Sequence, residues 1–101
     1  MDELIEHFEY YAEEAVSGSP ERVESAIASL DTIVHCTLPA LKPTPLTREA
    51  TLFFESLLWN ARRVLHEPAA VSSIRANARG MQRLRAPRAV RVEAEVRTAW
   101  G

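Results

Sequence analysis

The chain has 101 residues, 47% of them hydrophobic, a formal net charge of −2 and a single cysteine, Cys36. This length and composition fit one globular domain rather than a disordered chain. No apolar run reaches the ~20 residues that cross a bilayer, the acidic start Met1-Asp2-Glu3 is unlike a secretory signal, and one cysteine cannot form an internal disulfide. We therefore expect one domain over residues 1–101, no membrane insertion and a cytoplasmic location.

Acidic and basic residues are segregated along the chain. Residues 1–61 hold eleven acidic and three basic residues, a net charge of −8, whereas residues 62–101 hold nine arginines and three glutamates, a net charge of +6. Such a distribution either neutralises itself across the fold or presents two oppositely charged faces to partners.

Two helices are expected before residue 40. The first begins with Asp2 as its N-cap and ends near Gly18, because glycine suits the left-handed conformation found at helix C-termini. Ser19-Pro20-Glu21 then supplies an N-cap, a first-turn proline and a first-turn acid for the second helix, which Pro39 ends. Apolar residues recur with a helical period: Leu4, Ile5, Phe8, Tyr11, Ala12, Ala15 and Val16 in the first helix, and Val23, Ala26, Ile27, Leu30, Ile33, Val34 and Leu38 in the second.

The third expected helix runs from about Pro45 to His66, with Thr44 as its N-cap, and Glu67-Pro68 breaks the chain after it. So wide an apolar arc predicts that this helix lies at the centre of the core. The arc consists of Leu46, Ala50, Phe53, Phe54, Leu57, Leu58, Ala61, Val64 and Leu65.

A fourth helix is expected from about Ala69 to Leu84, and Gly80 should weaken its end. Residues 88–100 fit both a helical and a strand pattern; we favour a helix because no second strand is available to pair with it. The predicted fold class is all-α, a single four- or five-helix bundle with a long central third helix. The apolar side of the fourth helix is formed by Val71, Ile74, Ala78 and Met81.

A second apolar side is expected on the third helix. Leu52, Trp59 and His66 are seven residues apart, opposite the main arc, and Arg63 lies among them. One interpretation is that the fourth or fifth helix covers these residues. The other is that they bind a partner, because tryptophan and arginine are enriched where binding energy concentrates. We expect self-association to bury this face, since an exposed apolar face is an aggregation liability.

The fourth helix carries Arg75, Arg79 and Arg83 at four-residue spacing, which places them on one ridge. The favoured interpretation is that this arginine ridge faces the glutamates of the first helix in a rim of surface ion pairs. The alternative is an anion site that binds nucleic acid or nucleotide. This is less favoured because the domain is net acidic and the basic half holds one aromatic residue, Trp100.

Signatures of catalysis or metal binding are missing from the sequence. His7, His35 and His66 do not occur in a spacing that places two ligands on one helical face, and no glycine-rich phosphate loop is present. His35 and Cys36 are adjacent, so their side chains diverge by about 100° on a helix. We expect no enzymatic activity, no metal and no cofactor.

The order of the expected elements has a parallel in a known family. An acidic first helix, the Ser19-Pro20-Glu21 break, a second helix ending near Pro39 and a longer third helix precede the arginine-rich segment from Asn77 to Leu84. Over residues 4–84 this layout resembles the small helical export chaperones of flagellar hook and filament proteins. The resemblance implies a groove between helices that binds an amphipathic segment of an unfolded client.

The expected function is therefore non-enzymatic protein binding, as an export chaperone or adaptor. One alternative is a small inhibitor or immunity protein of a phage or toxin system whose acidic face mimics nucleic acid. Another is nucleic-acid or nucleotide binding through the arginine ridge. Binding that falls steeply with salt would favour the ridge, whereas salt-tolerant association would favour the apolar face.

Overall fold

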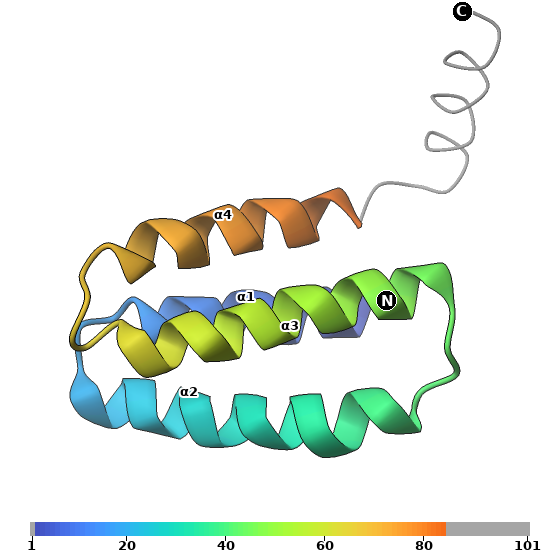
Figure 1. Ribbon diagram of the computed structural model, residues 1–101, viewed down its shortest axis with the longest axis horizontal. Helices are drawn as coiled ribbons and strands as arrows, with labels where there is room; N and C mark the ends of the chain where they lie inside the picture. Colours follow the sequence, from blue (N-terminus) through green and yellow to red (C-terminus); the bar gives the residue numbers. More distant parts are fainter. Residues whose placement is uncertain (1, 85–101) are drawn as a thin grey trace, which may run out of the picture.

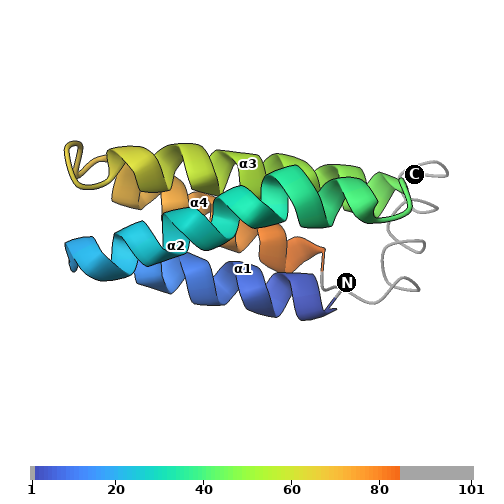
Figure 2. The ribbon, with the colours of Figure 1, turned by 90° about the horizontal axis from the view of Figure 1, so that it is seen from below.

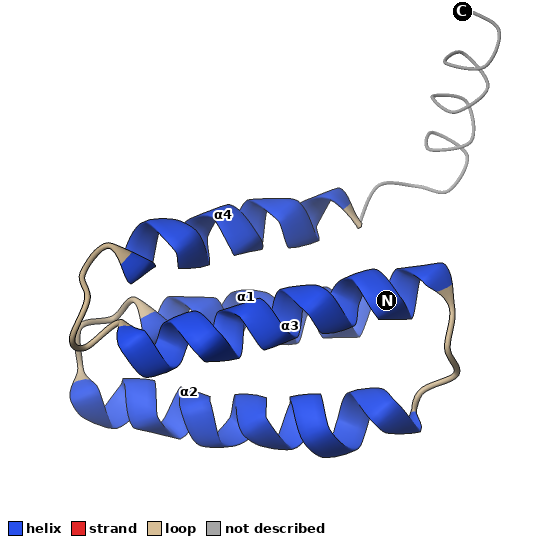
Figure 3. Ribbon diagram, viewed as in Figure 1, coloured by secondary structure: helices blue, strands red, loops and turns tan. Residues whose placement is uncertain are grey.

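The computed structural model describes residues 2–84, and no strand occurs among them (Figure 3). The prediction of an all-helical fold is confirmed for this part of the chain, while the segment 88–100 lies outside it. The elements are α1 (Asp2–Ala15), α2 (Pro20–Thr32), the π-helix η1 (Ile33–Thr37), the 3-10 helix η2 (Leu38–Ala40), α3 (Pro45–Arg63) and α4 (Ala70–Arg83).

The predicted signals at the starts of α2 and α3 are confirmed. The Ser19 side chain accepts a hydrogen bond from the Arg22 backbone N–H, and Pro20 occupies the first turn. At α3, Thr44 Oγ1 accepts from the Thr47 backbone N–H at 3.1 Å and Thr47 Oγ1 accepts from the Thr44 N–H at 2.7 Å. This reciprocal pair is a capping box formed by two threonines.

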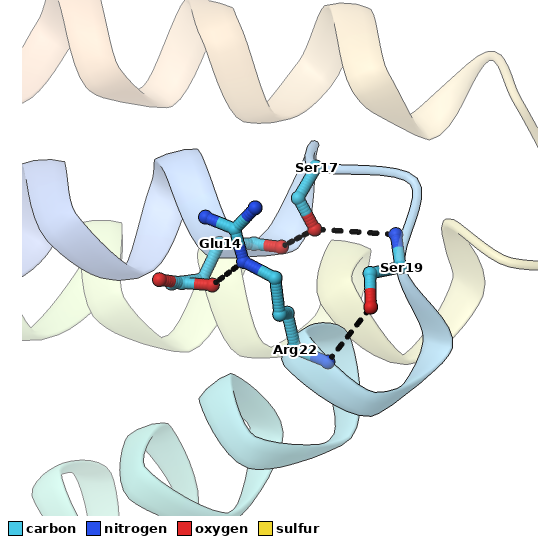
Figure 4. A network of polar contacts seen from close by, with 4 residues as sticks. All are labelled: Glu14, Ser17, Ser19 and Arg22. Atoms are coloured by element: carbon cyan, nitrogen blue, oxygen red, sulfur yellow. Dashed lines mark hydrogen bonds and ion pairs between the residues drawn. The ribbon is translucent and has the colours of Figure 1, made fainter.

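The turn between α1 and α2 is held by the polar network in Figure 4. Gly18 has a φ of 80°, the left-handed conformation that was expected of it. Ser17 Oγ donates to the Glu14 carbonyl at 2.7 Å and accepts from the Ser19 N–H at 3.3 Å. Arg22 Nε lies 2.5 Å from Glu14 Oε2, and its hydrogen bond and charge hold the pKa of that carboxyl below its usual value. A carboxylate and an arginine thus join the two helices at their shared end.

The second helix does not end as predicted. Its α-helical part stops at Thr32, and the chain continues through η1 and then η2, which contains Pro39. The Leu38 N–H bonds to the Ile33 carbonyl, five residues back, as in a π-helix. A proline ring conflicts with the carbonyl four residues before it, so a regular α-helix cannot continue through Pro39. The chain instead forms the wider π-helix η1 and then the narrower 3-10 helix η2.

Smaller corrections apply to the other helix ends. Asp2 lies within α1 rather than before it, and α3 ends at Arg63, three residues earlier than predicted. The N–H groups of His66 and Glu67 both bond to the Arg63 carbonyl, which closes a turn. Leu65 was predicted to lie on the buried arc but is 42% exposed, because helical periodicity no longer applies beyond the end of α3.

The helices alternate in direction, and α1 and α3 lie between α2 and α4 (Figures 1 and 2). Phe8 and Phe54 meet edge to face across the α1/α3 contact, with ring centroids 5.1 Å apart. Helix α2 contacts both α1 and α3, and so does α4. The largest fully buried side chains are Phe8, Phe54, Ile5, Leu30, Leu57, Ile74, Met81 and Val23.

Gly80 has a packing role that the sequence did not suggest. A Cβ built on it would lie 2.5 Å and 2.7 Å from the outer carbons of the Phe53 ring. The absence of a side chain at Gly80 therefore lets α4 approach the Phe53 ring of α3 closely. The residue that was expected only to weaken the end of the helix thus makes a tight contact between two helices.

Replacing Gly80 with alanine is expected to lower the free energy of unfolding by about 1–2 kcal/mol, as overpacking against Phe53 requires. The sign is the test, because the same change at an exposed helical site stabilises by about 1 kcal/mol. Urea denaturation measures the difference, and the double variant Gly80→Ala with Phe53→Leu should recover part of the loss. A stabilised Gly80→Ala protein would show that the contact is loose.

Candidate protein-binding site

The outward face of α3 exposes two large apolar side chains. Leu52 is 66% exposed and Trp59 is 63% exposed, whereas the opposite side of the same helix buries Phe54 and Leu57 completely. Helix α4 packs against the flank of α3 and does not cover this face, so the expectation that the fourth helix covers it is wrong. The fifth expected helix lies outside the described residues. We call Leu52, Trp59 and Arg63 the α3 outer face.

Trp59 contacts Arg63, one turn further along α3. The Arg63 guanidinium carbon lies 5.6 Å from the centroid of the indole ring, in a cation–π arrangement. Arg63 also donates to Glu67 Oε2 from Nε at 3.2 Å and from Nη2 at 2.5 Å, and to Asn60 Oδ1 at 3.3 Å. These contacts with Arg63 hold the pKa of Glu67 below its usual value. The Trp59 indole therefore lies against an arginine that is itself bonded to Glu67 and Asn60.

His66 does not join this face by helical periodicity. It lies in the turn beyond α3 and is exposed. The structure thus brings together Leu52, Trp59 and Arg63 of the four predicted partner-binding residues and leaves His66 at the edge.

An open groove of about 540 Å³ runs between α3 and α4 beside Leu52. Its apolar part is formed by Leu52, Phe53 and Leu84. Ser56 Oγ of α3 donates to Asn77 Oδ1 of α4 at 2.9 Å, and within α3 Asn60 Nδ2 donates to the Ser56 carbonyl at 2.9 Å. The full lining is Glu49, Leu52, Phe53, Ser56, Asn77, Gly80, Arg83 and Leu84.

A smaller recess of about 230 Å³ lies on the other flank of α3, against η1. Trp59 and Leu58 form its α3 side and Val34 and His35 form its η1 side. Close by, Arg62 Nη2 pairs with Asp31 Oδ1 at 3.0 Å and joins α3 to α2. The α3 outer face is therefore flanked by a recess on each side, and the larger one is the groove toward α4.

The three residues of the arginine ridge are exposed but occupy different surroundings. Arg75 lines a recess of about 400 Å³ between α4 and α1, together with Glu9 and Glu13. Arg83 instead lines the α3/α4 groove. This divergence arises because each four-residue step rotates about 40° around a helix, so the ridge crosses from one edge of α4 to the other.

The favoured interpretation of the ridge was a rim of ion pairs with the glutamates of α1; Arg75 does lie beside those glutamates, but no such ion pair occurs among the described residues. Within residues 2–84 the ion pairs are Arg22–Glu14, His35–Asp31, Arg62–Asp31 and Arg63–Glu67, and none includes Arg75, Arg79 or Arg83. Arg75 lies beside the α1 glutamates without an ion pair to another residue of 2–84. Arg83 lines the groove, and Arg79 is exposed between the two.

Neither a metal cluster nor a membrane span is found in the described part of the chain. No group of three or more His, Cys, Asp or Glu side chains there could hold a metal ion. No helix there is long and apolar enough to span a bilayer. Cys36 is exposed on η1.

The family resemblance implied a groove between helices, but sequence reasoning did not locate it between α3 and α4. Phe53 had been assigned to the core and Gly80 to a weak helix end, yet the two meet at its base. The usable signal was the presence of small or polar residues on the facing sides of two helices, Ser56 on α3 and Asn77 and Gly80 on α4, where close approach is possible.

Comparison of the chain with protein-family models, curated proteins and solved structures finds no match.

Proposed function

We propose that this chain is a non-enzymatic protein-binding module that holds an amphipathic segment of another protein along the α3 outer face and the adjoining groove. The observation that carries the proposal is the exposure of Leu52 and Trp59 on one side of a helix whose opposite side is fully buried. Clustered exposed apolar side chains commonly mark interaction sites, and tryptophan with arginine is the typical composition of their energetic centres.

The spacing of the two anchors supports a helical partner. Seven residues of α-helix separate Leu52 from Trp59 by about 10.5 Å. An amphipathic helix presents apolar side chains at the same interval, which is the pattern of helix-in-groove recognition. The groove of about 540 Å³ beside Leu52 offers space for the apolar side chains of such a segment.

The fold proposed with this function is a four- or five-helix bundle in which the third helix is central. Its support is that α3 contacts α1, α2 and α4 and is the longest α-helix among residues 2–84. The order of the helices favours one biological role for such binding, that of an export chaperone or adaptor that protects a client segment. Self-association through the same face is the competing use of these residues.

Tryptophan fluorescence tests the proposal. The chain has two tryptophans, so the variant Trp100→Phe leaves Trp59 as the only indole emitter. Titration with an 18-residue amphipathic helical peptide carrying a leucine stripe should shift the emission of Trp59 to shorter wavelength as the indole leaves water.

Matched leucine variants supply the control. Leu52→Ser should weaken peptide binding, whereas Leu41→Ser, at a leucine that is 38% exposed after η2, should not. An emission maximum that does not move at any peptide concentration, in a protein that sedimentation shows to be monomeric, would contradict the proposed function. A concentration-dependent shift without peptide would assign the face to self-association.

A further inference from the structure

The α3/α4 groove has a positive rim on its α4 side. Helix α4 contains three arginines and no acidic residue. Arg83 lines the groove, and Arg79 is exposed one turn earlier on the same helix. Neither takes part in an ion pair with another residue of the described range 2–84. The α4 rim therefore presents positive charge directly beside an apolar groove.

Among the other charged groups near the α3 outer face, two arginines have ion-pair partners, Glu55 lines the recess beside Trp59, and Arg48 is exposed one turn before Leu52. Arg63 is engaged by Glu67, and Arg62 by Asp31. Glu49 lies on the α3 rim, opposite α4. Within residues 2–84, the cations on the α4 side of the groove are Arg83, which lines it, and Arg79, which is exposed one turn earlier.

On the basis of the proposed function, we propose that the occupant of the groove is an acidic amphipathic helix of a partner protein. Its apolar side chains lie against Leu52, Trp59 and Phe53, and carboxylates on its flank face Arg83 and Arg79. Charge complementarity of this kind fixes the orientation of a partner and suppresses wrong partners more than it raises affinity. Arginine suits the role because its planar guanidinium can bind a carboxylate through two parallel hydrogen bonds.

Two model peptides test the charge preference. Both are 18-residue helical peptides with one leucine stripe, and the positions flanking the stripe carry glutamate in one peptide and lysine in the other. At low ionic strength the glutamate peptide should bind roughly two- to fivefold more tightly for each arginine that it engages. This preference should shrink at 0.5 M salt, where the Debye length is only a few ångströms.

A matched pair of variants locates the preference. Arg83→Gln should reduce the discrimination between the peptides, and Arg83→Glu should abolish or reverse it. Arg75→Gln removes the same charge from the same helix at its α1 edge and should leave discrimination unchanged. Both positions are exposed, and glutamine is nearly as good a helix former as arginine, so the variants should fold alike. Circular dichroism checks this.

The outcomes separate this inference from the proposed function. Equal binding of both peptides, unaffected by Arg83→Gln, would overturn the acidic partner and leave the protein-binding function intact. Failure of both peptides to bind would remove both proposals. Tight binding of a single-stranded oligonucleotide, weakened equally by Arg75→Gln and Arg83→Gln, would overturn the inference and assign the ridge to phosphate.

Discussion

Replacing Phe54 with alanine is expected to lower the free energy of unfolding by about 3–5 kcal/mol, a large part of the roughly 5–15 kcal/mol that stabilises a typical domain. Phe54 is fully buried, and its ring meets Phe8 edge to face at the contact between α1 and α3. Truncation would remove this aromatic contact and leave a cavity in the layer of the fold that α2 and α4 both pack against. Chemical denaturation followed by circular dichroism measures the loss.

The matched control lies two residues away on the same helix. Leu52→Ala also truncates an apolar side chain of α3, but Leu52 is 66% exposed, and the change should stay within about 0.5 kcal/mol. Similar losses in the two variants would mean that Leu52 is covered in solution, and a small loss at Phe54 would place the core elsewhere.

Replacing Trp59 with alanine is expected to weaken partner binding by about 2 kcal/mol or more, close to thirtyfold, because tryptophans at the centre of an interface often carry such energies. The isolated domain should lose no more than about 1 kcal/mol of stability, mainly through the missing cation–π contact with Arg63. Isothermal titration with a peptide that binds the wild-type protein measures the change in binding, and urea denaturation measures the change in stability.

The reverse combination would decide against this role. A strictly monomeric protein at high micromolar concentration in which Trp59→Ala costs ~3–5 kcal/mol would place the indole in the core, beneath a part of the chain outside residues 2–84. Arg63→Gln is a useful companion variant. Glutamine keeps much of the side-chain length and removes the charge. Arg63→Gln therefore measures what the cation–π contact contributes to binding while the Trp59 ring stays present.

The local signals in the sequence were sufficient to predict where most helices begin. Ser19-Pro20 and Thr44-Pro45 each combine a side-chain cap with a first-turn proline, and Gly18 adopts the positive φ expected of it. Such signals act through neighbouring residues and need no tertiary context. The helix ends at Thr32 and Arg63 were missed because they depend on how the chain accommodates Pro39 and enters the loop before Pro68.

The candidate site was only partly predictable, for a physical reason. Periodicity showed that Leu52 and Trp59 share a side of α3 opposite the core, but coverage by another helix depends on packing angles that one helix does not specify. The course of the arginine ridge required the orientation of α4, which separates the surroundings of Arg75 from those of Arg83. The groove depended on the contact between Gly80 and Phe53, two residues far apart in sequence.

Because α3 has one buried side and one exposed side, a ligand bound to the α3 outer face would also stabilise the folded protein. The helix contributes Phe54 and Leu57 to the interior and displays Leu52 and Trp59 outside, so the outer face has its shape only while the interior is assembled. A ligand that recognises this shape binds the native chain and not the unfolded one, and at a hundred times its dissociation constant it adds about 2.7 kcal/mol to the unfolding free energy. Loss of the partner would then shorten the lifetime of the protein in the presence of proteases.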